Sequence, residues 1–318
     1  MSIRRCAAMV AVALVVSCLT GCLGISKKSA AEFDAAVEEY FRGSDLVVSA
    51  DSVTNGVFFS DSYPTTAVTL ELVDDVDADA YVDLIEGATT ALADDVEDKN
   101  IDFVNIYGTT RVSGTPITIS IGLFEERFVD KPSSLRVPIA VAKTYIRPGI
   151  ESLSVDSQGI DVAYTGTSSV PEGLITAVPD DLGPDQTVHS SFNAGEWEIE
   201  MRLSPGWDVS GVDLRALMDS GPGSRISIHS AQNRGLDGAE LELSEIRSSR
   251  APEALRAIGD ASGLVSVGLC LEDDHVGHRS TPKTESCLRY TVENGKLSVM
   301  RGEPTQSQAA EVLEDAGL

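Results

Sequence analysis

The sequence is short of positive charge. It holds 24 Lys and Arg against 50 Asp and Glu, which gives a formal net charge of −26 at pH 7. This much negative charge repels phosphate backbones, so nucleic acid is excluded as a partner. Hydrophobic residues make up 42% of the chain, an ordinary share for a globular protein, and we therefore expect the acidic residues to cover a folded surface.

The sequence also lacks the local patterns that mark the commonest active sites. It contains no GxSxG nucleophile elbow, no P-loop, no HExxH zinc motif and no GxGxxG dinucleotide loop. A CxxC spacing for redox or metal chemistry is missing too. We therefore expect a protein that does not catalyse a reaction and that carries no cofactor.

The N-terminus carries two arginines followed by an apolar run. Arg4 and Arg5 precede the uncharged stretch from Cys6 to Leu19, which is shorter than the roughly 20 residues that a membrane-spanning helix needs. At its end, Leu19-Thr20-Gly21-Cys22 resembles the lipobox of bacterial lipoproteins. The resemblance implies that residues 1–21 are a signal peptide and that the thiol of Cys22 receives a diacylglyceryl group. Cys22 then begins the mature chain, and residues 22–30 form a tether.

The remaining cysteines predict a disulfide. Of the five cysteines, Cys6 and Cys18 lie in the expected signal peptide and Cys22 is taken by lipid. This leaves Cys270 and Cys287. An even number of remaining cysteines in an exported protein is typical of a disulfide.

Apolar periodicity predicts an α+β fold, with antiparallel sheets that carry helices on one face. Alternation indicates strands, and spacing of three and four residues indicates helices. The order β-α-β-β-α-β occurs twice, and this order resembles the ferredoxin-like, or split βαβ, arrangement. A stretch rich in Pro, Gly and Asp separates the two halves. We expect a first domain at 31–170, a linker at 171–191 and a second domain at 192–318.

Five acidic residues in the segment DVDADAYVDLIE follow the ligand spacing of an EF-hand calcium loop. They are Asp75, Asp77, Asp79, Asp83 and Glu86. Ala80 stands where such a loop needs Gly for its sharp turn, and a strand rather than a helix is expected before it. The other interpretation is an acidic helix start, in which the carboxylates lie near the positive end of the helix dipole.

Two histidines form a second candidate metal site. His275 and His278 lie three residues apart beside Asp273 and Asp274, and nitrogen and oxygen ligands of this kind suit a transition metal. They fall between Cys270 and Cys287, in an acidic segment of a kind that is usually only solvated. We expect no metal here.

The sequence therefore predicts a lipoprotein on the extracytoplasmic face of a cell membrane, with a binding or scaffolding role. Its partners are membrane lipid through Cys22 and an unidentified envelope protein or small ligand. The alternative is a lipid-anchored solute-binding protein of a transporter, although such proteins are normally built from two doubly wound lobes. An envelope hydrolase would need a nucleophile and a base that no pattern identifies.

Overall fold

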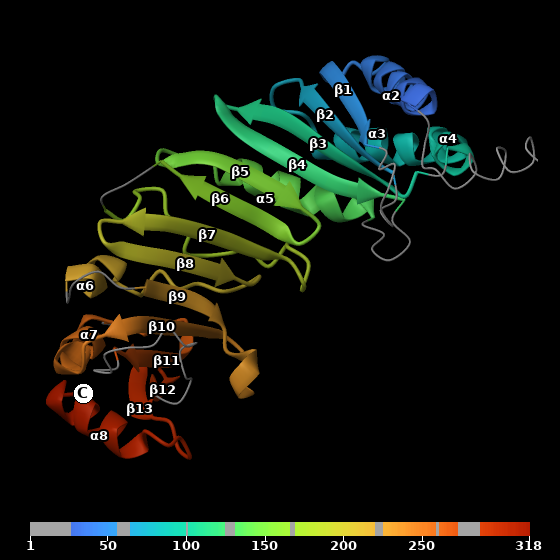
Figure 1. Ribbon diagram of the computed structural model, residues 1–318. Coiled ribbons are helices and arrows are strands. Elements are labelled where there is room, and N and C mark those ends of the chain that lie inside the picture. Colours follow the sequence, from blue (N-terminus) through green and yellow to red (C-terminus); the bar gives the residue numbers. More distant parts are fainter. Residues whose placement is uncertain are drawn as a thin grey trace, which may run out of the picture. The chain divides into compact units, whose positions relative to one another are not determined.

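The computed structural model describes residues 27–55, 64–99, 101–124, 131–165, 169–219, 225–258, 261–272 and 287–318 (Figure 1). The chain divides into two compact units, Met1–Ile139 and Ala140–Leu318, and each is described by itself. No helix of the described part is long and apolar enough to cross a membrane.

The first unit is a four-stranded sheet with helices. Its strands lie side by side in the order β1-β2-β3-β4. The pairs β1–β2 and β3–β4 are antiparallel, whereas β2 and β3 are parallel and are joined through two helices. The elements are α2 (Lys27–Arg42), β1 (Val47–Asn55), β2 (Thr65–Leu72), α3 (Ala78–Ala91), α4 (Ala93–Asp98), β3 (Phe103–Val112), β4 (Thr115–Leu123) and the 3-10 turn η1 (Pro132–Leu135). Helix α5 (Arg136–Thr144) follows and continues into the second unit.

The alternation of buried and more exposed residues along β2 explains how this sheet forms. Val68, Leu70 and Leu72 are buried, and the residues between them face outwards. The buried side of α3 includes Tyr81 and lies over the same face of the sheet. A Cβ at Gly108 of β3 would lie 3.0 Å from the Tyr81 hydroxyl, so the helix approaches β3 closely where this strand has no side chain.

The second unit repeats the same hairpin pattern over nine strands, in chain order from β5 to β13. Hairpins are antiparallel, and successive hairpins meet through the parallel pairs β6–β7, β8–β9 and β10–β11. The elements are β5 (Ile150–Asp156), β6 (Gly159–Tyr164), β7 (Thr187–Ala194), β8 (Trp197–Leu203), α6 (Leu214–Asp219), β9 (Arg225–Ser230), β10 (Ala239–Ile246), α7 (Ala251–Ala257), β11 (Leu264–Leu271), β12 (Cys287–Glu293), β13 (Lys296–Val299) and α8 (Gln306–Asp315), with short 3-10 turns at Gln232–Arg234 and Ser248–Arg250.

The predicted α+β class is confirmed, and the chain order β-α-β-β-α-β is present twice, as β2-α3-β3-β4-α5-β5 and β8-α6-β9-β10-α7-β11. The arrangement in space is simpler than the split βαβ pattern. The strands that a helix joins, such as β2 and β3, pair directly with each other, and no other strand is inserted between them. Within each unit, each hairpin therefore adds beside the previous one.

Residues 171–191, where the sequence predicts a linker, lie within the second unit. Ile175, Val178 and Leu182 are buried there, and β7 begins at Thr187. The backbone N–H of Val178 donates to the carbonyl of Trp207, 2.9 Å away. The domain boundary at 171–191 stays a prediction, and a proteolysis experiment that tests it is given below.

Candidate functional site

The carboxylates of the calcium-like segment cap a helix and form ion pairs. The Asp77 side chain accepts a hydrogen bond from the backbone N–H of Ala80, 3.0 Å away, and is the N-cap of α3. Asp79 and Asp83 both contact Arg136, at 3.2 Å and 3.1 Å. This geometry matches the acidic helix start.

The outer members of the same set lie before and after the helix cap. Asp75 has a positive φ of 54°, and its backbone N–H donates to the carbonyl of Arg111 at 2.8 Å. Glu86 lies within α3, more than two turns beyond the Asp77 cap. In the described ranges, no three His, Cys, Asp or Glu side chains are gathered closely enough to hold a metal ion.

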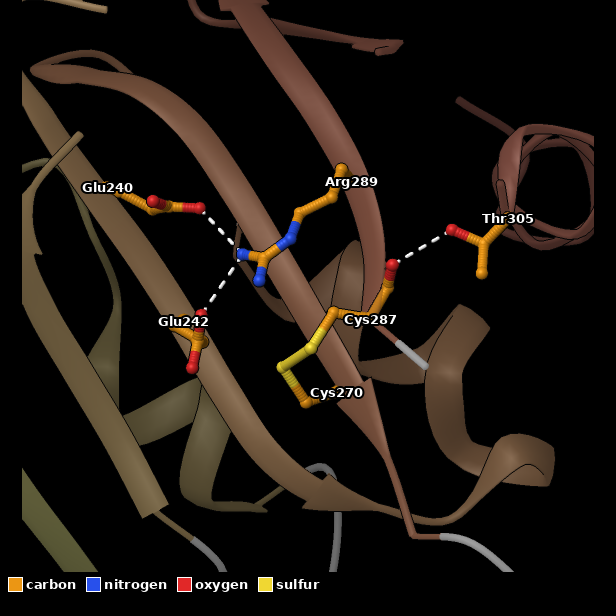
Figure 2. Close-up of a disulfide and its surroundings, with 6 residues drawn as sticks. All are labelled: Glu240, Glu242, Cys270, Cys287, Arg289 and Thr305. Carbon is orange, nitrogen blue, oxygen red and sulfur yellow. Dashed lines mark hydrogen bonds and ion pairs between the residues drawn. A yellow bond between two sulfur atoms is a disulfide. The ribbon is translucent and has the colours of Figure 1, made fainter. Parts of the chain in front are cut away.

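Three predicted site residues, Cys22, His275 and His278, lie outside the described residues. The predicted cysteine pair is described. The Sγ atoms of Cys270 and Cys287 are 2.02 Å apart, which is disulfide distance, and the two residues are directly opposite each other in the β11–β12 pair (Figure 2). The Thr305 hydroxyl donates to the Cys287 carbonyl at 2.9 Å, which ties the residue just before α8 to the same strand.

A row of charged side chains crosses one face of the second unit's sheet. We call it the ionic row, and its members are Asp161 (β6), His189 (β7), Glu200 (β8), Arg225 (β9), Glu240 and Glu242 (β10) and Arg289 (β12). The strand registers place all of them on the same face. Among these seven residues, apart from the two carboxylates on β10, acidic and basic side chains alternate from strand to strand. Arg202, the register partner of His189, and Glu198 lie on the same face.

The β6–β9 end of the ionic row is open to solvent. His189 Nδ1 lies 2.8 Å from an Asp161 oxygen, and its Nε2 lies 3.6 Å from a Glu200 oxygen. The other Glu200 oxygen accepts a hydrogen bond from Arg225. This bond holds the pKa of Glu200 below its ordinary value and raises the pKa of Arg225. The negative charge of Glu242 on β10 also raises the pKa of Arg225. The exposed and the buried ends of the ionic row therefore interact electrostatically.

The β10–β12 end of the ionic row is buried. Arg289 Nη1 donates to Glu240 at 2.7 Å and to Glu242 at 3.0 Å, and the side chains of Arg289 and Glu240 are only 2% and 3% exposed (Figure 2). A buried guanidinium is tolerated only when carboxylates compensate its charge, as they do here.

A buried serine lies beside the cluster. Ser266 of β11 is the register partner of Glu240. Its hydroxyl is buried and has no hydrogen-bond partner among the described residues. The arrangement is suited to holding charges at fixed positions on a sheet surface.

The second unit also contains an open hollow of about 570 Å³, beside the start of α6. Its lining includes the apolar side chains of Val170, Leu174 and Val212 and the charged residues Asp213 and Arg215. The carboxylate of Asp213 accepts a hydrogen bond from the backbone N–H of Ala216 at 2.9 Å.

The ionic row was not predicted from the sequence. The one local signal is the alternation in AELELSEI, which puts Glu240 and Glu242 on the same face of a strand. The partners of these carboxylates come from strands far along the chain, at positions that no local pattern indicates. No family model matches this chain, and searches of curated proteins and of solved structures found no match either.

Proposed function

We propose that this chain is a lipid-anchored protein of the bacterial envelope that binds or scaffolds a partner and catalyses no reaction. The observation that carries the proposal is Leu19-Thr20-Gly21-Cys22 at the end of a short uncharged run that follows Arg4 and Arg5. Two or more acyl chains on one cysteine hold a protein at a membrane, where a single chain is marginal. The anchor therefore leaves the rest of the chain on the extracytoplasmic side.

The open end of the ionic row is the surface that we propose for the partner. The side chains of Asp161 and Arg225 are 61% and 46% exposed, on strands that neighbour β7 and β8. A rigid sheet that presents charges of both signs at fixed spacing recognises a partner by complementary charge, which improves specificity and association rate more than affinity. This chemistry suits an envelope protein with a matching polar surface.

The anchor is tested by replacing single cysteines of the N-terminal region. Cys22→Ser removes the thiol that accepts lipid, and we expect unprocessed precursor and loss of lipid labelling. Cys18→Ser is the matched control, because it makes the same change four residues earlier in the apolar run, and it should be lipidated and processed like the original protein. Normal lipidation of the Cys22→Ser variant would rule out this anchor.

The binding role is tested by cross-linking in living cells. A photoreactive amino acid at Ser191, which is exposed on the ionic-row face opposite Glu200, should give one or a few discrete adducts. The same amino acid at Glu172, exposed in the connection between β6 and β7, is the control and should give none of these adducts. Identical adduct patterns at both positions, or no adduct from Ser191, would contradict a partner at the ionic row.

A second candidate function is delivery of a small solute to a transporter, and the hollow beside α6 favours it. A ligand there would contact the apolar wall and the charges of Asp213 and Arg215. Native mass spectrometry of protein purified from its own cells should then detect a bound small molecule. The variant Leu174→Trp fills part of the hollow and should lose that molecule, while Val53→Trp, an exposed position of the first unit, should keep it.

A further inference from the structure

Helix α2 lies antiparallel to the edge strand β1 (Figure 1). Hydrogen bonds from three side chains of the helix define its direction relative to β1. Asp34 accepts a hydrogen bond from the Thr54 hydroxyl at 2.7 Å, Glu38 accepts from the Ser52 backbone N–H at 3.1 Å, and Arg42 donates to the Ala50 carbonyl at 2.9 Å. Later residues of the helix thus contact earlier residues of the strand.

The start of α2 consequently extends past one end of the first unit's sheet. Asp34 is already level with Thr54, next to the last residue of β1, and Lys28 lies roughly 9 Å further along the helix axis. We call this end of the sheet the proximal end. It is formed by the strand-terminal residues Asn55, Thr65, Phe103 and Leu123, which the registers align.

The chain between the proposed lipid anchor and α2 is very short. Only residues 23–26 separate Cys22 from Lys27, where the helix begins. Five residue steps lead from Cys22 to Lys27, and even fully extended they reach about 18 Å. The acyl chains on Cys22 lie in the bilayer, so the first turn of α2 stays within this distance of the lipid surface.

We propose that the proximal end of the first unit faces the outer headgroups of the membrane that anchors the protein. This inference rests on the lipid anchor of the proposed function and adds which surface of the first unit meets the bilayer. The opposite end of the sheet is about 26 Å further away, the length of the eight-residue strand β2. Asp45 and Asp74 lie at that opposite end, next to the start of β1 and the end of β2.

The charge of the proximal end indicates which headgroups it meets. Asp102 precedes β3, and its backbone N–H donates to the Pro64 carbonyl at 2.9 Å; α4 ends nearby, because the N–H of Ile101 donates to the Val96 carbonyl. Asp94, Asp98 and Asp102 are exposed there. Lys28 in the first turn of α2 is exposed as well, but these three carboxylates outnumber it and disfavour anionic lipids, so the partner surface is a zwitterionic headgroup layer. The tether rather than charge attraction holds the proximal end close.

The test measures the distance of two matched positions from the membrane. Asp102→Cys at the proximal end and Asp45→Cys at the opposite end remove the same charge from exposed sites. The lipidated protein is labelled with a fluorescent donor and reconstituted in phosphatidylcholine vesicles whose headgroups carry an acceptor. We expect energy transfer several-fold more efficient from position 102 than from position 45. Equal transfer, or more from position 45, would overturn the proposal.

Mass spectrometry of each preparation establishes that Cys22 carries lipid before transfer is measured. If Cys22 carries lipid but position 102 does not transfer more energy than position 45, the orientation of the first unit is wrong and the anchor still stands. If Cys22 carries no lipid, the anchor itself is contradicted. Asp98→Cys and Asp74→Cys repeat the comparison at a second pair of exposed positions, in case one variant of the first pair does not fold. Inserting 12 Gly and Ser residues between Ile25 and Ser26 should reduce the transfer from position 102.

Discussion

Gly268 of β11 is directly opposite Arg289 of β12, and a Cβ on this glycine would stand 2.2 Å from Nη1 of the arginine. The guanidinium therefore passes over β11 where this strand has no side chain, and reaches Glu240 and Glu242 on β10 (Figure 2). A glycine in the middle of a strand is normally unfavourable. Here it makes a buried ion cluster across three strands possible.

The first prediction is that Gly268→Ala destabilises the second unit by displacing Arg289. Breaking a buried ion pair costs about 3–5 kcal/mol, because a charge is left without compensation, and we expect a loss that approaches this range in urea unfolding. In an Arg289→Ala background the same substitution should cost almost nothing, since no guanidinium is left to displace. Arg225→Ala, at the exposed end of the ionic row, should cost about 1 kcal/mol or less. Equal costs of Gly268→Ala in both backgrounds would show that the two residues are not coupled.

The second prediction compares two tyrosines of the first unit. The hydroxyl of Tyr81 is buried and has no hydrogen-bond partner in the described part of the chain, whereas the hydroxyl of Tyr40 donates to the Leu84 carbonyl at 3.1 Å. Tyr81→Phe removes an unsatisfied polar group, and we expect the free energy of unfolding to rise by about 1 kcal/mol. Tyr40→Phe leaves a carbonyl without its donor, and the free energy should fall by about 1 kcal/mol. A loss of stability in Tyr81→Phe would mean that its hydroxyl has a partner.

The local elements were largely predictable from the sequence. The alternation of TTAVTLELV and PITISIGL predicts β2 and β4, because strands with one buried face show a period of two. The spacing of Tyr81, Ile85 and Ala88 predicts α3, and all three side chains are buried. Asp77 as a helix cap was one of the two interpretations of the acidic segment. These features depend on neighbours within a few residues.

The pairing of elements was not predictable in the same way. Strand β7 starts at Thr187, inside the segment 171–191 that the sequence predicts as a linker. It was missed because its sequence, TVHSSFNA, places polar Ser190 on the buried face, so the apolar alternation is weak. Helix α8 was missed as well, since it has few apolar residues and its burial comes from contacts such as the Ala309 carbonyl with the Tyr290 hydroxyl. The ionic row depends on the registers of strands far apart in the chain, which one sequence does not specify.

The third prediction concerns acid titration of the ionic row. Arg225 holds the pKa of Glu200 below its ordinary value, so this carboxylate stabilises the fold above the ordinary carboxyl pKa. The contribution is lost as the pH falls through the lowered pKa. Carbon chemical shifts should show Glu200 titrating below an ordinary glutamate, and Arg225→Ala should move its midpoint up. Asp161→Asn is the control and should leave the midpoint nearly unchanged; an equal shift in both variants would contradict Arg225 as the cause.

The fourth prediction tests where the chain divides. The sequence predicts an exposed linker at 171–191, and limited proteolysis of a soluble form should then cut there first, because linkers make few contacts. In the structure this segment lies within the second unit and contains buried residues such as Val178. Two stable fragments produced by a cut at 171–191 would support separable domains with this boundary. Resistance of this segment, with cuts only elsewhere, would contradict it.

The central claim is that Cys22 carries the lipid that fixes this protein to the membrane, and the mass of the mature N-terminus tests it most directly. Protein extracted from membranes is digested, and the peptide that begins at Cys22 is analysed by mass spectrometry, with the Cys18→Ser variant treated in parallel. We predict that both preparations yield a peptide that starts at Cys22 and carries a diacylglyceryl group on its thiol. An unmodified Cys22, or a mature chain that starts at another residue, would contradict the account.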